Sequence, residues 1–318
     1  MTQVPAGRSI HVRVPASSAN LGPGFDAIGL ALGLWDEYVV TTTHQSGLAI
    51  TVVGEGAGDV PTDESHLVHA TMRHTWQELG VAPPAGLALE AHNGVPHGRG
   101  LGSSATAIVA GVVAAQALCV AEWPEPGEEV SVDRELAGHI SSVLEGHPDN
   151  ASASVHGGLT VSWIPDGTGL DVGARTVTAR PALHPDLEVV VFVPEAQLAT
   201  STARAVLPAN IPLRAAAANS GRAALLIHAL TSDPKHLHAG TREWLHQEPR
   251  RQSYAASMVL VDALRADGHA AVISGAGPTV LVLTTREAES AVVVPDGLGP
   301  WQRLTPGVPT TGARVTAR

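Results

Sequence analysis

Apolar residues occur along this chain in short runs, and one of these runs has a clear helical period. Between residues 65 and 79, apolar side chains recur at spacings of three and four, which predicts a helix with one buried face. Ser65 is a suitable N-cap for this helix, and Gly80 is suited to follow its last turn. Further helices are expected at residues 107–120, 133–144, 214–230 and 254–266. The first of these is apolar on all sides and should be buried.

Runs rich in β-branched residues and bounded by Gly or Pro predict the strands. These runs lie at residues 12–15, 36–43, 48–53, 87–91 and 187–193, and residues 271–284 indicate a strand, a glycine turn and a second strand. Because strands and helices are grouped and do not strictly alternate, the pattern favours an α+β fold over a doubly wound sheet. The segment 163–186 is rich in Gly, Pro and Thr, so we expect an N-terminal domain at 1–165 and a C-terminal domain at 166–318.

The composition excludes several classes of partner. The chain has 318 residues, 44% of them apolar, and a formal net charge of −11. This charge opposes binding to nucleic acid or to an anionic membrane, because both require a basic surface. Residues 1–10 have no apolar stretch typical of a secretion signal, and the apolar run 107–121 is short for a membrane span and is interrupted by Gln116. We therefore expect a cytoplasmic protein that binds neither nucleic acid nor membrane.

Cysteine and lysine are nearly absent from the chain. Cys119 is the only cysteine, which excludes an internal disulfide and fits a reducing compartment. Lys235 is the only lysine, and it follows Asp-Pro, so a Walker-type loop with its Gly-Lys-Ser/Thr sequence is excluded. Any phosphate bound here must therefore be neutralised by arginine, backbone amides, helix dipoles or a metal ion.

The segment 96–106, with the sequence PHGRGLGSSAT, indicates an anion site. It has three glycines at every second position and then two serines, directly before the apolar helix expected at 107–120. The N-terminus of a helix has unpaired backbone N–H groups and partial positive charge, and glycines let an anion approach the backbone closely. The serine hydroxyls can bond phosphate oxygens or a metal ion carried by them. The segment therefore predicts a loop that holds the phosphates of a nucleotide.

Three further strings bring polar residues together. Residues 15–26 form a turn-rich loop that presents an amide and a carboxylate after the first predicted strand. Residues 144–151 place a glutamate at a helix end and then a turn with His, Asp and Asn. Residues 273–280 form a glycine-rich turn between two apolar strands, which requires close backbone approach.

Together these strings resemble the motifs of a known enzyme family. The order Pro-x-x-x-Gly-Leu-Gly-Ser-Ser-Ala resembles the phosphate loop of the GHMP kinase superfamily, and residues 273–280 resemble its third motif. Residues 15–26 and 144–151 resemble the homoserine kinase family within it, and the four motifs follow in the expected order between residues 12 and 283. Two departures are the Ala-Ser-Ala-Ser at 151–154, where the family has Val-Ala-Pro-Ala, and the Ala-Thr at 199–200, where it has Ser-Thr.

The resemblance implies a fold and an activity. The fold is the two-domain α+β GHMP kinase fold, with a ribosomal-protein-S-five-like N-terminal domain, a ferredoxin-like C-terminal domain and the active site between them. The activity is the ATP-dependent phosphorylation of the side-chain hydroxyl of L-homoserine to O-phospho-L-homoserine, a step toward threonine. The resemblance further implies that the chain forms a homodimer and that Mg²⁺ is bound together with ATP.

The resemblance also implies residue roles. The nucleotide is expected to contact Pro96, His97, Gly98, Arg99, Gly100, Leu101, Gly102, Ser103, Ser104, Ala105, Thr106, Ser274, Gly275 and Gly277. Ser104 and Glu145 are the expected metal ligands. The expected homoserine pocket consists of Asn20, Asp26, His147, Asp149, Asn150, Arg204 and Arg250, among which Asn20, Asp26, Asn150 and Arg204 are the catalytic candidates.

Several alternatives stay open on the sequence. The hydroxyl of the substrate either attacks without a strong base, aligned by Asn20 and Asn150, or is deprotonated by Asp26, which otherwise binds the ammonium group. Which of Arg250 and Arg251 faces the site is not settled. The enzymatic alternative is another GHMP small-molecule kinase, acting on mevalonate or a sugar, and the other alternative is a non-catalytic, ligand-binding member.

A zinc site is a further hypothesis, suggested by the 16 histidines of the chain. His66, His69 and His74 fall on the helix predicted at 65–79. His66 and His69 share a face, but His74 lies about 140° from His69 around the helix axis. Because no cysteine or third facing ligand is near, we expect no zinc here.

Overall fold

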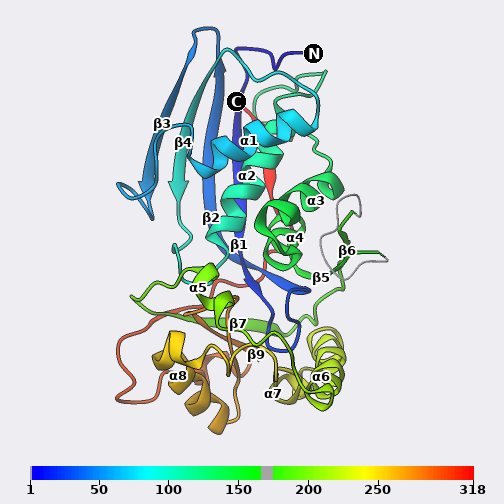
Figure 1. The fold of residues 1–318 in the computed structure, drawn as a ribbon, viewed down its shortest axis with the longest axis vertical. Coiled ribbons are helices and arrows are strands. Elements are labelled where there is room, and N and C mark those ends of the chain that lie inside the picture. Colours follow the sequence, from blue (N-terminus) through cyan, green and yellow to red (C-terminus); the bar gives the residue numbers. More distant parts are fainter. Residues whose placement is uncertain (1, 166–174) are drawn as a thin grey trace.

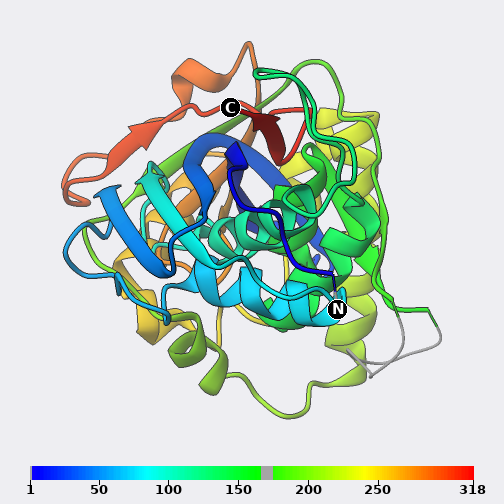
Figure 2. The ribbon, with the colours of Figure 1, turned by 90° about the horizontal axis from the view of Figure 1, so that it is seen from above.

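The computed structural model describes residues 2–165 and 175–318. These residues form two β-sheets that follow one another along the long axis of the molecule (Figure 1). Helices accompany both sheets, as the side view and the view from above show (Figures 1 and 2). The strands are β1 (Ser9–Ala19), β2 (Ile28–Thr43), β3 (Gly47–Gly54), β4 (Gly86–Asn93), β5 (Leu159–Trp163), β6 (Val177–Ala179), β7 (Leu187–Val193), β8 (Ala270–Ile273), β9 (Val280–Thr285), β10 (Gln302–Leu304) and β11 (Arg314–Ala317). The α-helices are α1 (Leu67–Glu78), α2 (Ser103–Ala117), α3 (Arg134–Glu145), α4 (Pro148–His156), α5 (Thr200–Ala205), α6 (Leu213–Thr231), α7 (Leu237–Gly240) and α8 (Ala255–Ala266), and the 3-10 helices are η1 (Pro234–His236), η2 (Arg251–Tyr254) and η3 (Glu289–Ala291).

The larger sheet has seven strands and is formed by both ends of the chain. Its main path is β11-β1-β2-β4-β3, with β5 paired to β2 and β6 paired to β5. All pairs are antiparallel except β3 and β4. Because β11 returns to pair with β1, both chain ends lie in the upper part of the molecule in Figure 1.

Helix α2 is central in the larger part because its small residues let neighbours approach on every side. Twelve of its 15 residues are buried. At Gly111 of α2, an added Cβ would lie 2.7 Å from Thr71 Cβ of α1, so a side chain has no space there. The indole nitrogen of Trp76 in α1 donates a hydrogen bond to the Ala115 carbonyl at 3.1 Å. This packing holds α2 firmly, and its N-terminus points toward the smaller sheet (Figure 1).

The smaller sheet is antiparallel, in the order β10-β7-β9-β8, and its strands β7, β8 and β9 are buried on both faces, whereas the edge strand β10 is largely exposed. On β7, Val189 and Val191 pack in one cluster with Leu30 of the larger sheet. Val190 and Phe192, on the opposite face of β7, pack in another cluster with α8 residues. The continuous apolar run of β7 is explained by this two-sided burial, and the two sheets share one hydrophobic core where they meet.

Most elements expected from the sequence are confirmed, with shifted ends. The helices predicted at 107–120, 133–144, 214–230 and 254–266 appear as α2, α3, α6 and α8, and the strand at 187–193 is β7. Ser65 is not the N-cap of α1: His66 holds that position, and the Ser65 hydroxyl donates to Asp63 Oδ1 at 2.6 Å. Gly80 follows the helix in a left-handed conformation, as expected.

Besides the N-cap at Ser65, two further expectations about local structure were wrong. Residues 15–19 are not part of a loop but complete β1, because they pair with residues 29–35 of β2 across a bulge. The polar string at 147–150 is not a turn: Pro148 begins α4, and Pro is favoured at the first helical position. The first half of β2 and the strands β5, β6, β10 and β11 were not predicted, and most of these four are short.

The domain division proposed from the sequence stays a prediction. The expected boundary lies between residues 165 and 166, at the edge of the segment 166–174, which falls outside the described residues. The strand β11, from the far end of the chain, belongs to the larger sheet.

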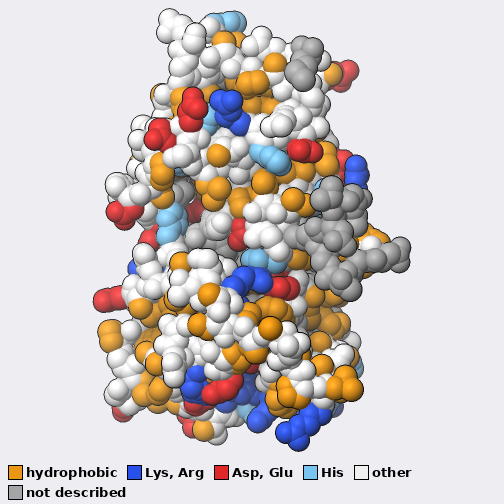
Figure 3. Space-filling view, in the orientation of Figure 1, with side chains coloured by type: hydrophobic (Ala, Val, Ile, Leu, Met, Phe, Trp, Pro, Cys, Tyr) orange, Lys and Arg blue, Asp and Glu red, His pale blue; other side chains and the backbone are white. Residues whose placement is uncertain are grey.

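The structure bears on two partners that the composition opposes, a membrane and a nucleic acid. Among the helices of the described residues, none is long and apolar enough to cross a membrane. On the face drawn in Figure 3, basic and acidic side chains are interspersed over the described residues. No continuous basic patch is seen on this face of the described residues, and the absence of a nucleic-acid partner stays a prediction.

Stability should fall in mild acid because of His156, the last residue of α4. Burial lowers the pKa of His156 to about 4, and the charges of Arg180 and Arg134 add to this effect. The unfolded chain, with an ordinary pKa of 6.5, therefore takes up the proton first, and stability is lost as the pH falls from 6.5 toward 4. Between about pH 7 and about pH 5, we expect the free energy of unfolding to drop by about 2 kcal/mol from this group. Urea unfolding at both pH values measures this drop in the free energy of unfolding. The variant His156→Gln should show a smaller drop, because it lacks the titrating group. If the drop is as large in the variant as in the wild-type chain, His156 is not its cause.

Candidate active site

A cavity lies where the two sheets meet, and it collects most of the residues singled out in the sequence. Its lining comes from the segment before α2, from the start of α2, from the turn between α3 and α4, from α5 and from the turn between β8 and β9. The predicted site residues that line it are Asn20, Gly98, Gly100, Gly102, Ser103, Ser104, Glu145, His147, Asp149, Asn150, Arg204, Arg250 and Gly275.

The glycine-rich segment before α2 is held by close backbone contacts. A Cβ at Gly100 would lie 2.3 Å from the Ser274 carbonyl oxygen and 2.9 Å from the Gly277 nitrogen. A Cβ at Gly102 would lie 2.3 Å from Ser17 Oγ. Both glycines have φ near +75°, which also favours glycine. The segment and the turn after β8 therefore form one packed unit, and the Ser274 hydroxyl donates to the Gly100 carbonyl at 2.6 Å.

Asp36, a buried carboxylate that was not predicted as a site residue, links the residues that follow β4 to the first turn of α2. Asp36 Oδ1 accepts hydrogen bonds from the backbone of Gly94 and Val95, both at 2.9 Å. Its Oδ2 accepts one from the Thr106 hydroxyl at 2.5 Å. Burial raises the pKa of Asp36, although these hydrogen bonds oppose the shift. The sequence contains no distinct signal for Asp36, because it begins the strand predicted at 36–43 and is followed directly by a second acidic residue, Glu37.

The cavity floor carries a hydroxyl and a carboxylate that face each other. The Ser104 hydroxyl, at the start of α2, donates to Glu145 Oε2 at 3.0 Å. Glu145 is the last residue of α3, and Gly146 ends this helix in a left-handed conformation. Burial raises the pKa of Glu145, and His147 and the Ser104 hydroxyl oppose this shift. Two oxygen donors of this kind can hold a hard divalent cation.

The first turn of α4 presents an imidazole, a carboxylate and an amide to the cavity. His147 Nδ1 donates to Asp149 Oδ1 at 2.6 Å. Burial of the His147 ring opposes protonation, but the hydrogen bond and charge of Asp149 raise the pKa of His147 overall. Asn150 Oδ1 accepts a hydrogen bond from Ser17 Oγ at 3.1 Å, which orients its amide.

The loop after β1 begins at Asn20 and ends at Asp26, and both residues have positive φ. Asn20 Nδ2 donates to the Gly275 carbonyl at 3.0 Å, and Asn20 Oδ1 accepts from the Asp26 backbone N–H at 3.0 Å. The Asp26 carboxylate lies outside the cavity lining but forms a two-pronged pair with Arg204, at 2.5 and 3.1 Å. Both side chains of the pair are 35% exposed, so a ligand can reach them.

The arginine that faces the cavity is Arg250, which resolves the ambiguity with Arg251. Arg250 is 1% exposed, and its Nε donates to the Ala203 carbonyl at 2.8 Å. Arg251 instead pairs with Glu248 and Asp262 on the surface.

A second residue missed by the sequence analysis is His246, which is fully buried beside Arg250. Its Nε2 donates to the Gly22 carbonyl at 2.8 Å, its Nδ1 lies 3.5 Å from Arg250, and its ring stacks on Phe25. Burial lowers the pKa of His246, so the neutral ring is favoured. His246 therefore ties the Asn20–Asp26 loop to Arg250, and its place just before the string 247–250 was the available signal.

Some predicted nucleotide contacts do not line this cavity. Arg99 turns to the carbonyls of Pro194 and Glu195, at 3.0 and 3.1 Å. Leu101 is buried in the shared core, and the Thr106 hydroxyl faces Asp36. The other predicted contacts outside the lining are Pro96, His97, Ala105, Ser274 and Gly277.

The chain matches two family models, "GHMP kinases N terminal domain" at residues 66–158 and "GHMP kinases C terminal" at residues 215–294. It is 45% identical over 307 residues to the homoserine kinase of Streptomyces avermitilis, covering 96% of this chain and 95% of that protein. It is 48% identical over 290 residues to the homoserine kinase of Rhodococcus opacus, covering 90% of each.

The fold agrees with these relationships. The crystal structure of homoserine kinase from Cytophaga hutchinsonii aligns with a TM-score of 0.78 at 24% identity, over 96% of this chain and 97% of that one. Mevalonate diphosphate decarboxylase from Staphylococcus aureus aligns with a TM-score of 0.61 at 16% identity, over 97% of this chain and 98% of that one. The expected two-domain α+β GHMP kinase fold is thus confirmed, and the chain belongs to the homoserine kinase family of the GHMP kinases.

Proposed function

We propose that this chain transfers the γ-phosphoryl group of ATP to the side-chain hydroxyl of L-homoserine, giving ADP and O-phospho-L-homoserine, a step toward threonine. The observation that carries the proposal is one cavity lined by a glycine-rich helix start, by the Ser104–Glu145 pair and by Arg204, whose partner Asp26 lies just outside the lining. The relatives of this chain, homoserine kinases at 45% and 48% identity, support the same activity.

The triphosphate is held by the segment Gly98–Ser104 and by the start of α2. Backbone N–H groups and the helix dipole supply the positive potential, which agrees with the lack of a lysine at this place. The contacts of Gly100 and Gly102 with their neighbours fix the curve of the segment before ATP arrives, so little reorganisation is needed on binding. Use of ATP follows from the family.

Mg²⁺ is the cation that fits the Ser104 hydroxyl and the Glu145 carboxylate, because both are oxygen donors at the start of the phosphate-binding helix. When bound, it neutralises charge on the phosphate oxygens during transfer. The turn of Gly146 and the packing of α2 hold the two donors in place.

L-Homoserine is a zwitterion, and a matching pair of charges is present at the cavity, where Arg204 and Arg250 line the wall and Asp26 pairs with Arg204 beside it. Asp26 is suited to its ammonium group, and Arg204 together with Arg250 is suited to its carboxylate. Without ligand, Asp26 and Arg204 pair with each other, so substrate binding exchanges one internal ion pair for two contacts to the ligand. Neither charge is left unpaired in either state.

The hydroxyl is aligned for direct attack on the γ-phosphorus, and its proton passes to a phosphate oxygen. Asn150 is suited to this alignment, because Ser17 orients its amide at the cavity wall. Asn20 holds the loop that carries Asp26. His147, with its raised pKa, is suited to carry positive charge near the phosphates, since Asp149 supports its protonated form.

Glu145→Gln should raise the Mg²⁺ concentration needed for half-maximal rate by about tenfold, because an amide is a weaker ligand than a carboxylate. The Ser104 hydroxyl can still hydrogen bond to the amide oxygen, so the fold should be kept. Initial rates with Mg²⁺ varied at saturating ATP and homoserine measure the effect. Glu135→Gln, on the first turn of the same helix, is the matched control; an unchanged Mg²⁺ requirement in Glu145→Gln would remove Glu145 from the metal site.

The decisive test of the activity is ADP release by the purified chain with homoserine, mevalonate, galactose and shikimate as acceptors. We expect release to depend on homoserine and on Mg²⁺, with the other three acceptors near background. A preference for mevalonate or galactose would replace the proposal with another GHMP kinase activity. Binding of ATP with no turnover of any alcohol would indicate a non-catalytic member.

The remaining expectations concern location and assembly. A cytoplasmic location and a homodimer are supported by family resemblance alone. Light scattering of the purified chain measures the assembly, and a mass near the 32.6 kDa of one chain would exclude the dimer.

A further inference from the structure

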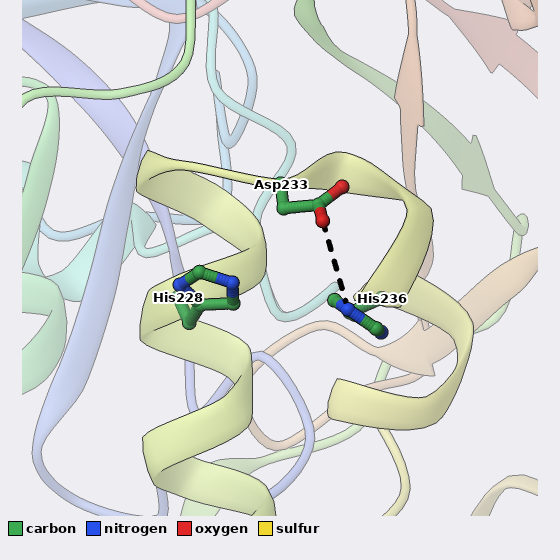
Figure 4. A group of neighbouring side chains, drawn as sticks. All are labelled: His228, Asp233 and His236. Carbon is green, nitrogen blue, oxygen red and sulfur yellow. Dashed lines mark ion pairs between the residues drawn. The ribbon is translucent and has the colours of Figure 1, made fainter.

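Two histidines and an aspartate come together at the end of α6, outside the cavity described above. His228 lies in the last turns of α6, Asp233 precedes η1 and His236 ends it. Figure 4 shows the three side chains directed toward one another across the bend between the two helices. Their potential ligand atoms all lie within 4.8 Å of one another, and none of the three residues lines the active-site cavity.

The backbone holds this arrangement. The N–H groups of Ser232 and Asp233 both donate to the His228 carbonyl, at 2.8 and 3.1 Å, so the chain folds back over the end of α6. The His236 N–H donates to the Asp233 carbonyl at 3.2 Å, which brings the second imidazole under the carboxylate. The centres of the two imidazole rings are 5.9 Å apart. The fold of the backbone thus keeps the three potential ligand atoms within 4.8 Å of one another.

We propose that His228, Asp233 and His236 bind a divalent transition-metal ion of the Zn²⁺ class. Two imidazoles and one carboxylate are a donor set that Zn²⁺ accepts in tetrahedral geometry, with water as the fourth ligand. Hard ions such as Mg²⁺ prefer oxygen ligands and are not expected here. The negative end of the α6 dipole also favours a cation at this place.

Without metal, Lys235 occupies part of the site. Its Nζ lies 2.5 Å from Asp233 Oδ2, and His236 Nε2 lies 3.6 Å from the same oxygen. The Lys235 side chain is 72% exposed, so its ammonium group can leave for solvent when a metal ion takes the carboxylate. Removing this competing charge should therefore strengthen metal binding.

The bound ion would join the end of α6 to η1 and α7, which lie behind the loop at Asn20–Asp26. Asn219 of α6 donates to the Pro23 carbonyl at 2.8 Å, and Gly22 packs against the Thr241 carbonyl just after α7. Metal binding should consequently stabilise this part of the fold, and its effect is measurable without any turnover.

The test is a titration of the full chain, prepared with no polyhistidine tag and freed of metal by a chelator. Co²⁺ is the probe, because its visible absorption reports tetrahedral ligation, and excess Mg²⁺ is present to occupy oxygen sites. We expect one Co²⁺ per chain, displaced by Zn²⁺, and a higher melting temperature with Zn²⁺ present. His228→Ala and His236→Ala should each weaken binding by about tenfold or more.

Two further variants sharpen the result. Lys235→Gln should tighten Co²⁺ binding severalfold, whereas His74→Ala, a histidine on α1, should leave it unchanged. Absence of a tetrahedral Co²⁺ spectrum in the wild-type chain would overturn the proposal. So would binding that His228→Ala and His236→Ala leave intact, since another set of histidines would then hold the ion.

Discussion

Gly100→Ala is expected to lower kcat/KM for ATP by about 10²-fold or more, because a misplacement of about 1 Å at a reacting site has an effect of this size. The new Cβ would lie 2.3 Å from the Ser274 carbonyl oxygen and 2.9 Å from the Gly277 nitrogen, and both are backbone atoms of a packed turn. The segment that holds the phosphates must therefore move away from the turn after β8. Steady-state kinetics with ATP varied, and nucleotide binding by calorimetry, measure the loss.

The control variant, Gly127→Ala, separates the effect of the steric clash at position 100 from the effect of backbone strain. Gly127 has φ +89° and nothing within 4 Å of its Cβ position, so Gly127→Ala carries the left-handed strain alone. It should cost about 1 kcal/mol of stability and leave the kinetics for ATP unchanged. Circular dichroism checks that Gly100→Ala still folds. A folded Gly100→Ala with normal ATP binding would contradict the placement of the phosphates in this segment.

Asp26→Asn is expected to raise KM for homoserine by about 10²-fold, with kcat kept within about threefold, because charge-assisted contacts of this kind contribute about 1.5–3 kcal/mol. Asn is the appropriate replacement, since Asp26 has φ +56° and Asn tolerates the left-handed region. The Asp26 backbone N–H still bonds to Asn20, so the loop should keep its shape. The substitution thus removes the charge that we assign to the ammonium group, together with the ion pair that this charge forms with Arg204 in the free chain.

The same experiment decides between the two roles of Asp26. Loss of kcat at saturating homoserine, with KM little changed, would identify Asp26 as the base. Asp262→Asn is the matched control, because Asp262 also forms a two-pronged pair with an arginine, Arg251, but on the surface away from the cavity. Its kinetic constants should equal those of the wild-type chain.

Helices and strands with a long apolar run or a clear periodicity were predicted from the sequence, whereas elements that lack such a pattern were missed. The helix predicted at 107–120, which covers most of α2, and the continuous apolar run of β7 were recognised because burial on all sides leaves a long apolar string. The strands β6, β10 and β11 have only three or four residues, too few for any periodicity to be visible. The start of helix α4 was interpreted as a turn, and the rest of the helix was not predicted, because its polar and small residues have no apolar face, although all nine of its residues are buried.

The chemistry of the candidate site was better predicted than its geometry. The motif strings supplied the segment Gly98–Ser104, Glu145 and the arginines, because local order alone carries a helix start or a turn. Asp36 and His246 were missed, since their partners are 58 and 224 residues away in the chain at Gly94 and Gly22. A neighbouring motif can draw attention to such a residue, as the string 247–250 does for His246, but no local pattern indicates a contact with so distant a partner.

What the sequence by itself determined is the family, the α+β class and the types of group in the cavity, since these follow from short strings and their order. Only the tertiary structure decided that Arg250 faces inward, that Asp26 and Arg204 pair across 178 residues, and that His228 lies beside His236. The physical reason is that side-chain direction depends on the packing of segments distant in the chain. Local residue types limit which contacts can form, and the shared core between the two sheets determines which of them do form.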